Sequence, residues 1–180
     1  MTQANAPLYK LVMMPFDADF DFLEELGRNA KTVYKESIES FEIMPRIDLP
    51  KNALSIKGDE ISDNAVQMAV RQIDTISAAE LLRHYNAGEK LVYVNDMVEQ
   101  MLHHAVPKAQ KIHLAIIPYF LYSDTIVQSG ASIPESGFAI MSTYGPDEKD
   151  AKIGVALQEV GNVIAGRHAT TEYEVERVNP

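Results

Sequence analysis

The residues of this chain best suited to chemistry lie close together near its C-terminal end. They are Gln158, Glu159, Asn162 and His168, which together offer two amides, one carboxylate and one imidazole. Gln158 and Asn162 are four residues apart, so on a helix they project from the same side. A carboxylate and an imidazole can move protons, whereas amides donate and accept hydrogen bonds. The segment could therefore serve a hydrolytic site or a surface that binds another protein.

A helix is predicted to carry these side chains. Pro146 and Asp147 open it, and it is expected to run from about residue 147 to 165, with Gly166 at its end. Apolar residues recur along it at helical spacing and should pack on a sheet; they are Ile153, Leu157, Val160 and Ile164. Gln158 and Asn162 then fall on a different, polar side. Residues 171–180, like residues 1–6, are expected to be flexible.

Strands and helices alternate in the rest of the chain. Apolar runs of strand length occupy residues 8–16, 40–44, 111–121 and 137–143, and the third of these should be central. Capping motifs at Asp21, Ser62, Ser77 and Asp96 predict that a helix begins at each. The acidic group from Asp17 to Glu25 is interpreted as the first turn of the first helix. This alternation predicts one α/β domain over residues 1–180, with a mixed, mostly parallel sheet packed against helices.

Composition excludes several classes of function. The chain of 180 residues has no cysteine, which rules out disulfides, thiolate zinc sites and cysteine nucleophiles. Its net charge of -10 and its lack of a Lys and Arg cluster argue against a nucleic-acid partner. No apolar run approaches the roughly 20 residues of a membrane span, and no secretory signal begins the chain. A cytoplasmic location without a membrane partner is therefore expected.

Other motifs are absent or uninformative. The chain has no G-x-S-x-G elbow, phosphate-binding glycine loop or dinucleotide fingerprint. His103, His104 and His113 are not expected to form a metal cluster. Adjacent histidines on a helix point about 100° apart, and the third lies in the next element. All three are expected at the surface.

The C-terminal segment resembles the metzincin zinc motif, H-E-x-x-H-x-x-G-x-x-H. The chain reads Q-E-x-x-N-x-x-A-x-x-H over residues 158–168, so Glu159 and His168 match and Ala165 replaces the glycine. The string EVGNVIAGRH that begins at Glu159 is similar to the archaemetzincin family, as is the order of the last two strands. The resemblance implies a zincin fold in which Glu159 stands at the general-base position. Gln158, Asn162 and His168 would stand at the ligand positions.

The departures from this motif imply that the zinc site is lost. Catalytic zinc needs three protein ligands, and neutral amide oxygens are poor ones. Without a metal, Glu159 has no polarised water to deprotonate. The cysteine-rich extension and second zinc site of the family also have no counterpart, and Ala169 directly follows His168 where the family continues toward its Met-turn. No catalytic residue, metal or cofactor is therefore expected.

The function predicted from the sequence is that of a catalytically inactive, metalloprotease-like protein that binds another protein. The predicted binding face comprises Gln158, Glu159, Asn162 and His168. Metzincins hold substrates along an edge strand, which needs backbone hydrogen bonds rather than metal. Two alternatives remain, a hydrolase rebuilt around Glu159 and His168 and a structural subunit of a larger assembly. The sequence leaves the partner and the oligomeric state open.

Overall fold

The computed structural model describes residues 8–50, 91–123, 126–143 and 148–178. Its centre is a five-stranded sheet in which the strands are ordered β2-β1-β4-β8-β7. The first four strands are parallel to one another, and β7 pairs with β8 in the antiparallel direction. The predicted α/β class with a mostly parallel sheet is confirmed. The strand bounds are β1 Tyr9–Pro15, β2 Ile38–Ile43, β4 Lys111–Ile117, β7 Gly130–Ile133 and β8 Phe138–Ser142.

The central strands are apolar on both faces, because both faces of the sheet are covered. In β1, Leu11 and Met13 belong to one core cluster, and Val12 and Met14 belong to another on the opposite face. Strands β4 and β8 divide their side chains in the same alternating way. This explains why the runs at 8–16, 111–121 and 137–143 show no polar alternation.

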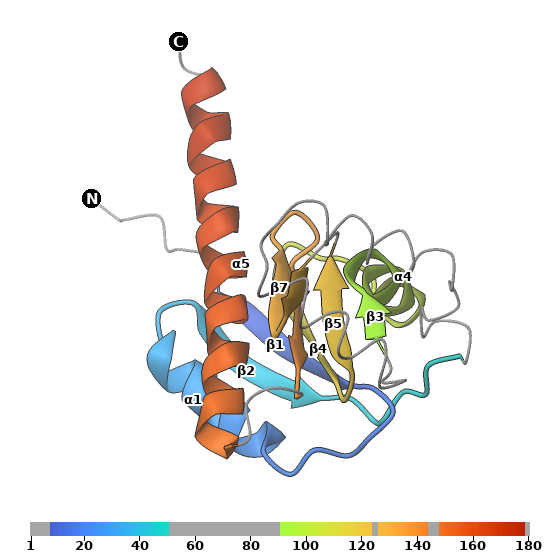
Figure 1. Ribbon diagram of the computed structural model, residues 1–180. Helices are drawn as coiled ribbons and strands as arrows, with labels where there is room; N and C mark the ends of the chain where they lie inside the picture. Colours follow the sequence, from blue (N-terminus) through green and yellow to red (C-terminus); the bar gives the residue numbers. More distant parts are fainter. Residues whose placement is uncertain (1–7, 51–90, 124–125, 144–147, 179–180) are drawn as a thin grey trace.

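The two faces carry different layers. Helices α1 (Leu23–Val33) and α5 (Lys149–Val178) lie together on one face, as Figure 1 shows. The other face carries α4 (Val94–His104) and a small sheet ordered β3-β5-β6 (Figure 1). The strands of this sheet span Leu91–Tyr93, Phe120–Ser123 and Ile126–Gln128. None of the helices in the described part of the chain is long and apolar enough to cross a membrane.

The strand predictions need three corrections. The run at 111–121 is not one strand, because β4 ends at Ile117 and β5 begins at Phe120 in the second sheet. Pro118 lies at this break. Proline has no backbone N–H, so within a continuous strand it would interrupt the ladder of hydrogen bonds. Strand β2 begins at Ile38, two residues earlier than predicted. Strands β3, β6 and β7 were not predicted at all.

The two capping boxes predicted within the described residues, at Asp21 and Asp96, do not form. Helix α1 has Phe22 at its N-cap and α4 has Tyr93, and neither has a side-chain capping bond. Tertiary packing sets the start of α1, since Phe22 and Leu23 are buried in the core. Asp21 is exposed, and α4 starts two residues before Asp96. The helices predicted from Ser62 and Ser77 lie outside the described residues, as do residues 1–6.

Helix α5 is longer than the sequence predicted. It continues without interruption to Val178, so the predicted end near residue 165 is wrong. Residues 171–178, expected to be flexible, are helical as well. Figure 1 shows this helix crossing the sheet and extending past it.

Candidate functional site

Helix α5 presents its predicted polar side away from the core. The helix packs on the sheet through an apolar stripe, of which Ile153, Ala156, Val160 and Val163 are buried. Gln158 and Asn162 are exposed, as their spacing predicted. On a neighbouring side, the hydroxyl of Tyr34 at the end of α1 donates a hydrogen bond of 2.7 Å to the Leu157 carbonyl. The polar face therefore belongs to a helix that is held on both the sheet and α1.

Glu159 differs from its exposed neighbours because it lies against the edge strand β7. It is partly buried, and its side chain contacts Gly130, the first residue of that strand. A Cβ atom at Gly130 would lie 2.6 Å from Glu159 Cγ and 2.9 Å from Cδ, far inside contact distance. The absence of a side chain at Gly130 therefore makes room for the Glu159 carboxyl group.

The carboxyl group of Glu159 is partly desolvated. Burial raises its pKa above the ordinary value, and a side-chain hydrogen bond with Asn162 lowers it by a smaller amount. Asn162 is exposed and can turn its amide either to Glu159 or to a bound molecule. Two of the four predicted site residues are therefore in direct contact, with Gln158 one residue before them.

The fourth residue, His168, is not brought back to this cluster by a turn. The backbone is helical through Ala165, Gly166 and His168. His168 follows Asn162 by six positions on the helix, so their backbones lie about 9 Å apart along the axis. Gly166 is needed for packing rather than for a helix end, because a Cβ there would lie 2.5 Å from the Pro134 ring.

Arg167 fixes this part of α5, a role that no sequence pattern indicates. Its guanidinium donates hydrogen bonds to four backbone carbonyls at 3.0 to 3.3 Å, those of Lys108, Ala109, Lys111 and Pro134. The same group lies 5.4 Å from the centre of the Tyr9 ring. The helix is thus attached to the start of β4 and to the turn between β7 and β8, so its position relative to β7 is set.

His103, His104 and His113 were not predicted to form a metal cluster. His103 and His104 are exposed, as predicted. His113 is only 4% exposed, so its predicted surface position is wrong. It lies on the central strand β4, whose two faces are both covered. Within the described ranges, no group of three His, Cys, Asp or Glu residues could hold a metal ion.

A second polar cluster lies where β1 and β4 end. Asp17 adopts a left-handed backbone conformation with φ of 60°, and its carboxylate accepts hydrogen bonds from the Leu49 amide and the Tyr119 hydroxyl. These bonds are 2.7 and 2.6 Å long, respectively. Burial raises the pKa of Tyr119, and its hydrogen bond to Asp17 raises it further. Asp17 is therefore not part of a helix turn, as predicted, but a structural link between β1 and two loops.

The arrangement of sheet and helices matches solved structures of archaemetzincins. The archaemetzincin of Archaeoglobus fulgidus, solved with malonate, aligns with a TM-score of 0.52 and 14% identity over 86% of this chain and 77% of its own. That of Methanopyrus kandleri aligns with a TM-score of 0.54 and 12% identity over 91% of this chain and 76% of its own. The chain has the archaemetzincin fold. No protein-family model and no curated protein sequence matches it.

Because the sequence identities are this low, the structural alignments show that the chain has the archaemetzincin fold and nothing more. A zinc-dependent peptidase from Methanocorpusculum labreanum also aligns, with a TM-score of 0.44 and 14% identity over 84% of this chain and 80% of its own. The resemblance indicated by the sequence is thus confirmed as a likeness of fold. The interpretation of Gln158, Asn162 and His168 as former zinc-ligand positions stays a prediction.

The contact between Gly130 and Glu159 can be tested by a double-mutant cycle. Gly130→Ala should lower the free energy of unfolding by about 1–3 kcal/mol, because the added methyl group overlaps the Glu159 side chain. Combining it with Glu159→Ala should recover at least about 1 kcal/mol, since the obstacle is gone. Urea unfolding measures both values.

Gly154→Ala is the control for this cycle. A Cβ atom at Gly154 meets nothing within 4 Å, so this variant should stabilise the helix by about 1 kcal/mol. Additive effects at residues 130 and 159 would contradict the contact.

Proposed function

We propose that this chain is a metal-free, archaemetzincin-like protein that binds an extended peptide along the outer edge of β7. The observation that carries the proposal is the contact of Glu159 with Gly130. Glu159 belongs to the polar face of α5 with Gln158 and Asn162, and its contact is with the first residue of the edge strand of the described sheet.

The register of β7 supplies backbone groups for such a peptide. The Ser142 amide donates a hydrogen bond to the Ser129 carbonyl, so the backbone groups of Ser129 point toward β8. Along a strand of an antiparallel pair, the backbone N–H and C=O groups of successive residues point alternately toward the partner strand and away from it. Ala131 and Ile133 therefore point their backbone groups toward β8. Gly130 and Ser132 point theirs outward, where an added strand would pair with them.

The face of α5 adds side-chain recognition to this backbone pairing. The Glu159 carboxylate can accept hydrogen bonds, and the Gln158 and Asn162 amides can both donate and accept them. A neutral amide is a poor ligand for zinc but a good partner for a peptide group. Peptide binding thus uses the groups that are present, and it needs no metal.

The test uses a peptide selected from a random phage-displayed library and synthesised with a fluorophore. Ser132→Pro removes one outward N–H and leaves the ladder to β8 intact, so it should weaken binding about threefold to tenfold. Gln158→Ala with Asn162→Ala should weaken it by a similar factor while changing the stability by no more than about 0.5 kcal/mol.

The matched control is Arg28→Ala with Thr32→Ala on α1. These two residues are also exposed and four apart on a helix, but they lie far from β7 in the fold. Affinity should be unchanged in this variant. Equal binding by the control, the proline variant and the α5 variant would place the peptide elsewhere and refute the proposal.

A hydrolase is the second candidate, and the raised pKa of Glu159 favours it. A partly buried carboxyl group beside an edge strand could exchange a proton with a bound peptide. Under the first proposal, purified protein should contain no stoichiometric zinc by elemental analysis, and it should not cleave the selected peptide. Cleavage that Glu159→Gln abolishes, with peptide affinity retained, would establish the hydrolase instead.

A further inference from the structure

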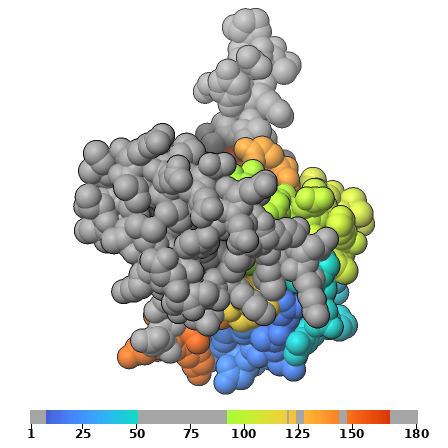
Figure 2. Space-filling view, turned by 45° about the vertical axis from the view of Figure 1, so that its right-hand side comes forward, coloured from blue at the N-terminus to red at the C-terminus, as the bar shows by residue number. Residues whose placement is uncertain are grey.

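A cavity lies on the side of the sheet opposite α5. It has a volume of about 250 Å³ and is lined by residues of β2, β1, β4 and the segment after α4. Val12, at its floor, belongs to the core cluster that packs against α4 rather than against α5. The surface of α4, green in Figure 2, borders the cyan surface of the segment after β2. The cavity is therefore separate from the peptide site proposed above.

His113 is a buried polar group that faces this cavity. The side chain is 4% exposed, and its ring packs edge to face against Phe138 at 5.6 Å between centroids. Its Nδ1 atom is buried without a hydrogen-bond partner in the described part of the chain. Buried polar atoms are nearly always paired, so an unpaired one on a residue that lines the cavity indicates a place for another polar group.

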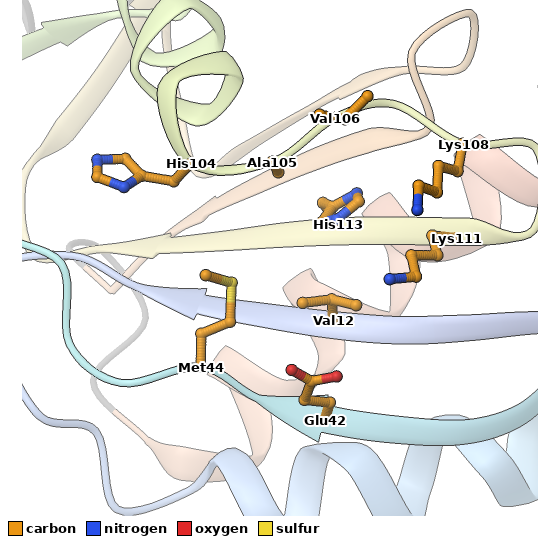
Figure 3. Close-up of a pocket in the computed structure, with 9 residues that line it drawn as sticks. All are labelled: Val12, Glu42, Met44, His104, Ala105, Val106, Lys108, Lys111 and His113. Atoms are coloured by element: carbon orange, nitrogen blue, oxygen red, sulfur yellow. The ribbon is translucent and has the colours of Figure 1, made fainter.

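The charges around the cavity favour an anion. Lys108 and Lys111 line it, and Figure 3 shows their ammonium groups beside His113. The acid among the described lining residues is Glu42, whose carboxylate lies 2.6 Å from Lys10 Nζ and is thus already neutralised. The hydrogen bond and charge of Lys10 lower the pKa of Glu42 most, and the charge of Lys111 lowers it further.

Apart from His104, the rest of the lining is apolar. Figure 3 shows Met44 on the side of the cavity away from the lysines, with Ala105 above His113 and Val12 below it. A volume of about 250 Å³ is slightly below the roughly 300 Å³ at which drug-sized pockets begin. Such a lining accommodates a small organic molecule better than an inorganic ion, which would leave the apolar wall uncovered.

We propose that this cavity binds a small organic carboxylate whose charge contacts Lys108, Lys111 and the His113 imidazole. Its apolar body would lie against Val12 and Met44. Binding would give the imidazole the polar partner that it lacks. The site is independent of the peptide edge at β7, since it uses the other face of the sheet.

The test follows the histidine side chains by NMR in protein labelled with ¹⁵N-histidine, at neutral pH and constant ionic strength. Butyrate is the probe, and it should shift the His113 resonance in a saturable way. Affinity should be modest, with a Kd on the order of 1 mM, because so small a ligand makes few contacts. Lys108→Gln with Lys111→Gln should weaken butyrate about fivefold or more.

Three comparisons decide the result. Lys31→Gln with Lys35→Gln removes two exposed charges at the end of α1 and should leave the butyrate affinity unchanged. Butylammonium, with the same apolar chain and the opposite charge, should not saturate the shift. Inorganic phosphate should bind more weakly than butyrate. Equal responses to butyrate and butylammonium, tighter binding of phosphate, or full affinity in the Lys108 and Lys111 variant would overturn the proposal.

Discussion

Arg167→Met is expected to lower the free energy of unfolding by roughly 3 kcal/mol. The guanidinium donates to the carbonyls of Lys108, Ala109, Lys111 and Pro134, and a methionine leaves all four without this donor. A hydrogen bond to a charged group contributes about 1.5–3 kcal/mol, and water can replace the donor only at the more exposed carbonyls. Urea unfolding at constant pH measures the loss.

Two further variants distinguish the effect of the Arg167 hydrogen bonds from the effect of its positive charge. Arg167→Lys keeps the charge but cannot reach four carbonyls, so it should lose most of the same stability. Gly137 has φ of 69°, and a Cβ atom there would overlap Arg167. Gly137→Ala should therefore be less costly in the Arg167→Met background, where the backbone strain and a close approach of 2.9 Å to the Lys111 carbonyl oxygen remain. Arg28→Met, an exposed change on α1, is the control; an equal effect there would contradict the role of Arg167.

The sequence predicted the parts of the fold that depend on local pattern. Strands β1, β4 and β8 were found because both of their faces are buried, which produces uninterrupted apolar runs. The stripe on α5 followed from helical spacing. Strands β3, β6 and β7 were missed because each has only three or four residues and no alternation of polar and apolar residues.

Long-range contacts account for the errors around the candidate site. Gly166 resembles a helix end in the sequence, but it is a glycine because the Pro134 ring lies against it. The position of Glu159 depends on Gly130, and that of α5 depends on carbonyls more than fifty residues away in sequence. Histidine is a polar residue, so its type does not predict burial. Only the order of the strands shows that His113 lies buried at the centre of the sheet. None of these contacts leaves a periodic signal.

The burial of His113 should make the stability of the protein depend on pH. Burial and the charges of Lys111 and Arg167 lower its pKa from 6.5 to about 4, against a smaller opposing effect of Glu42. The unfolded chain then binds a proton near pH 6.5 that the folded protein does not bind until about pH 4. Stability from this residue is therefore complete above pH 6.5 and is lost as the pH falls to 4.

The expected loss of stability is on the order of 3 kcal/mol between pH 7 and pH 4, because each unit of pKa shift corresponds to about 1.4 kcal/mol.

His113→Leu should abolish this part of the pH dependence. At pH 7 the variant should be as stable as the parent, since leucine is similar in volume and leaves no unpaired nitrogen. Comparing the two proteins at each pH cancels the carboxyl groups that they share. His103→Leu on the exposed side of α4 measures the effect of losing a histidine in general. If the parent and His113→Leu differ by the same amount at pH 7 and at pH 4, the imidazole is not held neutral by its position in the sheet.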